Sequence, residues 1–69
     1  MYFNLGDRVS MSAGATGTVV GIIERDEYAR NLEAWRWKSL TRGLIVLLDD
    51  GMFAHVREPE VGVRRLGEH

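Results

Sequence analysis

The clearest pattern along the chain is a pair of largely apolar runs, 44–48 and 52–57, separated by a short polar turn. The turn is Asp-Asp-Gly at positions 49–51. Acidic residues followed by glycine between two apolar runs are typical of a β-hairpin. A two-residue turn would place His55 among apolar residues on one face. A three-residue loop with Gly51 in the left-handed conformation leaves one face without polar residues, so we predict this register.

The opposite face of this hairpin is also largely apolar. It carries Ile45, Leu47, Phe53, His55 and Arg57. Because three of these five residues are apolar, we expect something to cover this face. One candidate is the stripe of Tyr28, Leu32 and Trp35 within the same chain, and the other candidate is a second subunit.

Two more strands are predicted before the hairpin and one after it. Residues 8–11 alternate between polar and apolar, and β-branched residues dominate 16–24. In a regular strand, Thr18, Val20 and Ile22 would share one face, and Val19 and Ile23 the other. Gly21 predicts a bulge or a close approach of another backbone. Pro59 ends the hairpin strand, and 61–64 is the predicted last strand.

The long connection 26–42 has two interpretations. Tyr28, Leu32 and Trp35 follow one another at i, i+4 and i+7, the spacing of one helical face, and this favours a helix. However, residues 35–38 alternate as they would in a strand. An extended arm is therefore the alternative.

The composition indicates one globular domain, 1–69, with 45% hydrophobic and 28% charged residues. The chain has no cysteine, which excludes thiolate metal sites and cysteine nucleophiles and favours a reducing compartment. Its longest apolar runs are far shorter than the roughly 20 residues of a membrane span, and 1–6 does not resemble a signal peptide. We expect a cytoplasmic protein without membrane contact. The net charge of −1 gives no support for a globally basic surface.

Several of these segments together resemble a known superfold. They are Gly6-Asp7-Arg8-Val9, Gly14, Gly17-Thr18-Val19, the run 44–51 and Val56. Their layout is similar to that of SH3-like small barrels, including KOW-type and Tudor-type modules. The resemblance implies an all-β, five-stranded antiparallel barrel with a long insertion, helical in our preferred interpretation, between its second and third strands. The chain departs from KOW modules because 12–16 has no basic residue. Members of the superfold bind RNA, bind peptides or serve as subunits, so the fold alone implies no single function.

Residues that suggest catalysis have simpler explanations. His55 alternates with Phe53 and Arg57, as a partly exposed strand residue would. Asp49 and Asp50 are typical turn residues that hydrogen-bond the local backbone. The pair Gly14 and Gly17 lacks the Lys-Ser/Thr of a phosphate loop. We therefore expect no enzyme activity, no cofactor, no metal and no small-molecule substrate.

The segment 25–42 is the main candidate for function. It carries five basic and three acidic residues, with Trp35 and Trp37 among them. Three interpretations remain open: the tryptophans cap the core, form a protein interface, or stack on nucleic-acid bases. We predict a non-catalytic binding or assembly module that contacts a partner protein or a second copy of itself, and RNA or DNA binding is the alternative. The candidate binding residues are Tyr28, Arg30, Leu32, Trp35, Arg36, Trp37, Lys38, Arg42 and Phe53.

Overall fold

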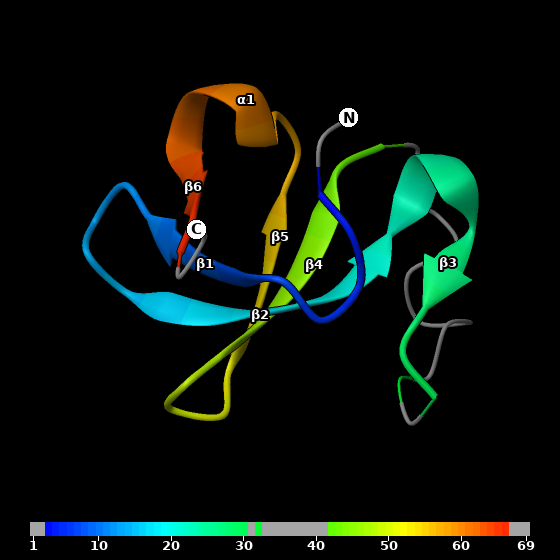
Figure 1. The fold of residues 1–69 in the computed structure, drawn as a ribbon, viewed down its shortest axis with the longest axis horizontal. Helices are drawn as coiled ribbons and strands as arrows, with labels where there is room; N and C mark the ends of the chain where they lie inside the picture. Colours follow the sequence, from blue (N-terminus) through cyan, green and yellow to red (C-terminus); the bar gives the residue numbers. More distant parts are fainter. Residues whose placement is uncertain (1–2, 31, 33–41, 67–69) are drawn as a thin grey trace.

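The computed structural model of the chain describes residues 3–30, 32 and 42–66. In this part of the chain, the backbone forms one antiparallel sheet of six strands and one short helix (Figure 1). The elements are β1 Arg8–Met11, β2 Thr16–Ile22, a 3₁₀ turn Ile23–Arg25, β3 Glu27–Tyr28, β4 Leu44–Leu48, β5 Phe53–Val56, α1 Pro59–Gly62 and β6 Val63–Arg65. The predicted all-β class is confirmed.

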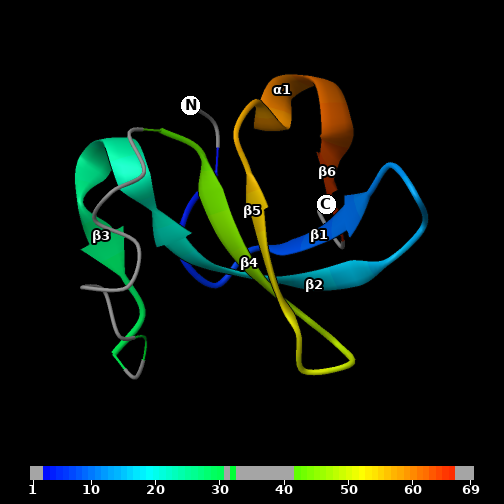
Figure 2. The ribbon, with the colours of Figure 1, turned by 180° about the vertical axis from the view of Figure 1, so that it is seen from behind.

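The strands lie in the order β5-β4-β2-β1-β6, and β3 pairs with β2 outside this path. The strand β1 pairs with β2 on one side and with β6 on the other, so the first and last strands lie side by side. The sheet is open in the described residues, with β5 and β6 at its two edges. Both views place β3 at one end of the long axis, far from α1 and β6 (Figures 1 and 2). Within the described residues, no helix has the length and the apolar character needed to cross a membrane.

The core lies on one face of this sheet and draws on strands from the whole chain. Its buried residues are Phe3, Val9, Val19, Ile22, Leu44, Val46 and Val63. Removing these apolar side chains from water is the main stabilising contribution to such a small domain. Polar side chains are absent from the buried set among the described residues.

The predicted hairpin register is confirmed. Leu47 pairs with Phe53 and Leu44 with Val56, and the amide of Leu48 donates a hydrogen bond of 2.8 Å to the carbonyl of Met52. This pairing leaves a three-residue loop, 49–51. Gly51 has a φ of +94°, a conformation that glycine adopts without steric cost.

A bulge in β2 confirms the prediction made at Gly21 and corrects the predicted faces. The register with β4 shifts between Val19 and Gly21, which makes Val20 the extra residue. An extra residue reverses the alternation of side chains, so Ile22 joins Val19 in the core and no longer shares a face with Thr18. The strand also ends at Ile22, two residues earlier than predicted.

The preferred helical interpretation of 26–42 is wrong for its first five residues. Asp26 closes the 3₁₀ turn with a φ of +55°, and Glu27–Tyr28 then forms β3. Tyr28 pairs with Gly21 across the ladder, because backbone pairing with an existing strand satisfies its polar groups. Residues 31 and 33–41 lie outside the described residues.

The end of the chain contains a turn of helix that the sequence pattern did not predict. Pro59 starts α1, and its fixed φ suits the first turn of a helix. The last strand is therefore Val63–Arg65 and not 61–64. The amide of Ser12 donates to the carbonyl of Gly62 at 3.0 Å, which joins this helix to the β1–β2 turn.

Candidate binding site on the outer face of the sheet

The outer face is defined here as the side of β2, β4 and β5 that points away from the core. Ile45, Leu47 and Phe53 lie on this face because they alternate with the core residues of the hairpin. Ile45 is nevertheless fully buried. A Cβ atom placed on Gly21 would lie 3.1 Å from Ile45 Cγ1 and 3.1 Å from Tyr28 Cδ1, so both side chains converge over this glycine. Tyr28, which belongs to one of the two candidates left open by the sequence, therefore covers part of the outer face.

A groove of about 270 Å³ lies on this face. It is lined by Val20, Ala29, Arg30, Leu32, Leu47 and Phe53. The β2 bulge contributes Val20, and the amide of Ala29 donates to the carbonyl of Val20 at 2.7 Å, which holds the turn after β3 against β2. Phe53 is 44% exposed, a high value for an aromatic side chain. The groove is thus built from three strands and one turn, and five of its six lining residues are apolar.

The groove brings together three of the predicted binding residues, Arg30, Leu32 and Phe53. Tyr28 lies beside it over Gly21. Arg42 does not line the groove, and its guanidinium forms an ion pair of 3.3 Å with Glu58. The other predicted residues, Trp35, Arg36, Trp37 and Lys38, lie outside the described residues.

Sequence reasoning missed Val20 and Ala29 as groove residues. Regular alternation would have grouped Val20 with Thr18 and Ile22, and only the bulge separates Ile22 from this set. The glycine that marks the bulge was the available signal. Ala29 is a small residue in a connection, and no periodic pattern marks it.

Most of the described arginines are engaged by carboxylates. The pairs are Arg8 with Asp49, Arg25 with Glu27, Arg42 with Glu58 and Arg65 with Asp7, at 2.7, 3.6, 3.3 and 3.3 Å. By contrast, Arg30 and Arg57 form no ion pair with any of the described residues. Arg64, in β6, likewise forms no ion pair with a described residue. Of these three arginines, Arg30 lines the groove on the outer face.

Asp49 has a larger structural role than the predicted local turn contact. It accepts two hydrogen bonds from the guanidinium of Arg8, at 2.7 and 2.8 Å, and one from the hydroxyl of Thr16. These hydrogen bonds, the one from Arg8 above all, hold the pKa of Asp49 well below its usual range. Asp50 does make the predicted contact, because its carboxylate accepts from the amide of Met52 at 2.9 Å.

His55 is an exposed residue of β5. Its Nε2 lies 2.9 Å from the carbonyl oxygen of Arg42. Since a carbonyl can only accept, this nitrogen carries the proton. In the described ranges, no group of three or more His, Cys, Asp or Glu side chains has the arrangement of a metal site.

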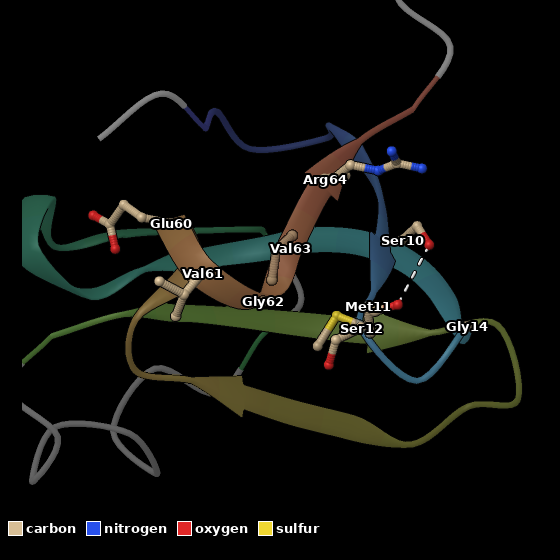
Figure 3. A pocket seen from close by; sticks show the side chains of 9 residues that line it. All are labelled: Ser10, Met11, Ser12, Gly14, Glu60, Val61, Gly62, Val63 and Arg64. Carbon is tan, nitrogen blue, oxygen red and sulfur yellow. Dashed lines mark hydrogen bonds between the residues drawn. The ribbon is translucent and has the colours of Figure 1, made fainter.

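A second depression, of about 420 Å³, lies between the β1–β2 turn and the α1–β6 segment (Figure 3). It is lined by Ser10, Met11, Ser12, Gly14, Glu60, Val61, Gly62, Val63 and Arg64. Glu60 and Arg64 lie at opposite ends of it and do not point toward each other. This depression therefore lacks a convergent set of polar groups, which a specific ligand site needs.

Comparisons of the chain with protein-family models, with curated proteins and with solved structures find no match. The function of the outer face must therefore be inferred from the side chains on it. They offer an apolar groove, one exposed aromatic ring and a cation at the rim.

Proposed function

We propose that this chain is a non-catalytic binding module that docks a partner protein through the outer face of its sheet. The observation that carries the proposal is the groove between β2, β4, β5 and the turn after β3, with its five apolar lining residues. None of the residues that line the groove belongs to the core on the other face of the sheet. The groove is thus additional apolar surface, and burying such surface against a partner is favourable.

Phe53 and Arg30 are the two residues of the groove that suit an interface best. Aromatic residues and arginine are enriched among residues that dominate protein–protein binding energies. Both lie at the groove, one from β5 and one from the turn after β3. We propose that the connection 25–42 contributes further contacts to the same partner through the predicted residues Trp35, Arg36, Trp37 and Lys38.

We also propose that the sheet is an SH3-like small barrel, as the resemblance implied. The strand order supports this proposal, because β1, β2, β4 and β5 pair in that order and the last strand returns to pair with the first. A turn of helix before the last strand redirects the chain toward β1.

Nucleic-acid binding by the segment 25–42 is the alternative, and it has less support. Tracking a phosphate backbone requires several available cations. In the described part of that segment, Arg25 is paired with Glu27 and Arg42 with Glu58, which leaves Arg30. One cation beside an apolar groove fits a protein partner better.

Site-specific photocrosslinking tests the proposal. Phe53 is replaced by the photoreactive analogue benzoylphenylalanine in the full chain, and Val61, which is 82% exposed and belongs to α1, is replaced in a separate control. After irradiation in extracts of cells that make the protein, we expect a discrete protein adduct from position 53 and none from position 61. An adduct with twice the mass of the chain would identify a second copy as the partner.

Two results would contradict the proposed function. A nuclease-sensitive adduct at position 53 would identify the partner as a nucleic acid. Adducts of equal yield at positions 53 and 61, or no adduct at either, would show that the groove has no special role in binding.

A further inference from the structure

The groove has one charged lining residue, Arg30. Three carboxylates on the neighbouring elements already have partners. Glu24 accepts a hydrogen bond of 2.9 Å from the amide of Gly43, Glu27 pairs with Arg25, and Asp49 is held by Arg8. Arg30 is exposed and forms no ion pair with any described residue. Its guanidinium is therefore available to a carboxylate from outside the chain, which it can bind with two parallel hydrogen bonds.

Arg57 is a second exposed cation of this region and comes directly after Val56, the last residue of β5. The chain as a whole carries a net charge of −1, whereas no described carboxylate neutralises Arg30 at the groove or Arg57 beyond β5. A face whose local charge is opposite in sign to that of the molecule favours partners of the complementary charge and increases their rate of association.

We infer that the partner is a protein segment that carries an apolar side chain next to a carboxylate, so that the apolar group enters the groove and the carboxylate binds Arg30. This inference rests on the proposed function. The apolar side chain of the partner is inferred from Val20, Leu47 and Phe53, and its carboxylate is inferred from Arg30.

The phosphates of a nucleic acid would attract Arg30, but a nucleic acid does not match the apolar residues that line the rest of the groove. Each nucleotide brings a phosphate, and the described residues of the groove offer one cation. An acidic peptide with apolar residues needs few cations, because its apolar side chains supply most of the binding free energy. The ratio of apolar to charged groups in the groove thus favours a peptide.

Selection from a random peptide library tests the inference. The full chain is immobilised, bound peptides are enriched and sequenced, and the affinity of one enriched peptide is measured by fluorescence anisotropy. The protein variants are Arg30→Glu, Phe53→Ser and the matched control Arg64→Glu, in which the exposed arginine lines the other depression. Amide spectra of each variant verify that the fold is retained.

We expect the enriched peptides to carry Asp or Glu beside an apolar residue. Arg30→Glu should weaken binding at least about tenfold. The change replaces an attraction by a repulsion, and the binding free energy lost is expected to exceed about 1.4 kcal/mol. Phe53→Ser should also weaken binding, and Arg64→Glu should leave it within about twofold of the wild type.

The outcomes separate this inference from the proposed function. The inference would be overturned, and the proposed function left intact, by peptides that lack acidic residues and bind Arg30→Glu as tightly as the wild type. Such peptides would still lose affinity for Phe53→Ser. Failure to enrich any peptide whose binding depends on Phe53 would overturn both.

Discussion

At the tip of the β4–β5 hairpin, Asp49 is held by side chains from two other strands. Arg8 comes from β1 and Thr16 from β2, and the guanidinium of Arg8 also donates to the hydroxyl of Thr18 at 3.0 Å. The side chains of Arg8 and Asp49 are 47% and 51% exposed, so water weakens their attraction, but the two parallel hydrogen bonds fix its geometry. These contacts attach the hairpin loop to the sheet.

The first prediction concerns the pH dependence of this contact. The pKa of Asp49 is lower in the folded chain than in the unfolded chain, so its contribution to stability is complete above the unfolded pKa of about 4 and is lost as the pH falls further. We expect Asp49→Asn to lower the melting temperature at neutral pH and to differ less from the wild type below pH 4. Thermal melts across this pH range measure the effect.

Glu60→Gln is the control for this measurement, because Glu60 is exposed and has no hydrogen bond or ion pair with the described residues. It should follow the wild type across the same pH range. A difference between Asp49→Asn and the wild type that stays constant down to pH 2 would contradict the account.

The second prediction concerns Gly51. Its φ of +94° is strained for any residue with a β-branched side chain, and a Cβ atom there would meet nothing within 4 Å. We expect Gly51→Val to lower the free energy of unfolding by about 1 to 3 kcal/mol through backbone strain alone. Gly51→Asn should cost less, since asparagine tolerates positive φ. Equal stability of both variants and the wild type in urea denaturation would show that the loop has another conformation.

At the scale of elements, β2 organises the sheet because it pairs with β1, β3 and β4. Because of its bulge, this strand contributes side chains both to the core and to the groove on the outer face. Val19 and Ile22 fill the core, whereas Val20, between them, lines the groove on the outer face. Gly21 leaves space for Ile45 and Tyr28 to meet over the strand. The candidate binding site is therefore a consequence of the irregularity in β2.

The third prediction tests this arrangement. In Gly21→Val, the new Cβ would lie 3.1 Å from side-chain atoms of both Ile45 and Tyr28, and the methyl groups would crowd them further. Such overpacking costs about 1 to 3 kcal/mol. In a double-mutant cycle, Tyr28→Ala should relieve part of this cost, so that the two changes together destabilise less than their sum. Strict additivity would show that Tyr28 does not pack over Gly21.

The elements that the sequence predicted correctly depend on local patterns. The hairpin register follows from a buried face that excludes His55, and β1 follows from the alternation of 8–11. The predicted helix over 26–42 is wrong in its described part, because Tyr28 pairs with β2 in the sheet. Its side chain lies over Gly21, as that of Ile45 does. Such contacts between distant segments leave no periodic signal in one sequence.

The candidate site was predictable only in part for the same reason. Arg30, Leu32 and Phe53 stood out by residue type, and the structure brings them to one groove. Val20 and Ala29 join them because of the bulge and the turn after β3, which no composition or spacing predicts. Arg42 does not line the groove, and its pairing with Glu58 depends on the return of the chain after β5.

At the scale of the whole molecule, the two faces of the sheet have different chemistry. One face holds the core, and the other holds an apolar groove with Arg30, which no described carboxylate neutralises. The second depression lies at the other end of the molecule, where α1 and β6 meet the β1–β2 turn (Figures 1 and 3). A binding partner should therefore contact one end of the domain and leave the other end free.

The fourth prediction separates a protein partner from a nucleic acid. A nucleic-acid complex releases counterions and weakens steeply with salt, whereas binding through an apolar groove responds little to salt. We expect single-stranded RNA of mixed sequence to leave the indole signals of the two tryptophans unchanged at both low and moderate salt. Shifts at low salt that disappear when salt is added would favour the nucleic-acid alternative.

The most direct test of the central claim is an amide correlation spectrum of labelled protein, titrated with a peptide selected on the full chain. If the outer face is the docking surface, the signals of Val20, Arg30, Leu47 and Phe53 shift in proportion to the bound fraction, while those of Ser12 and Val61 in the other depression stay in place. If Ser12 and Val61 shift and the groove residues do not, the binding site lies at the other end of the domain, and the claim is wrong.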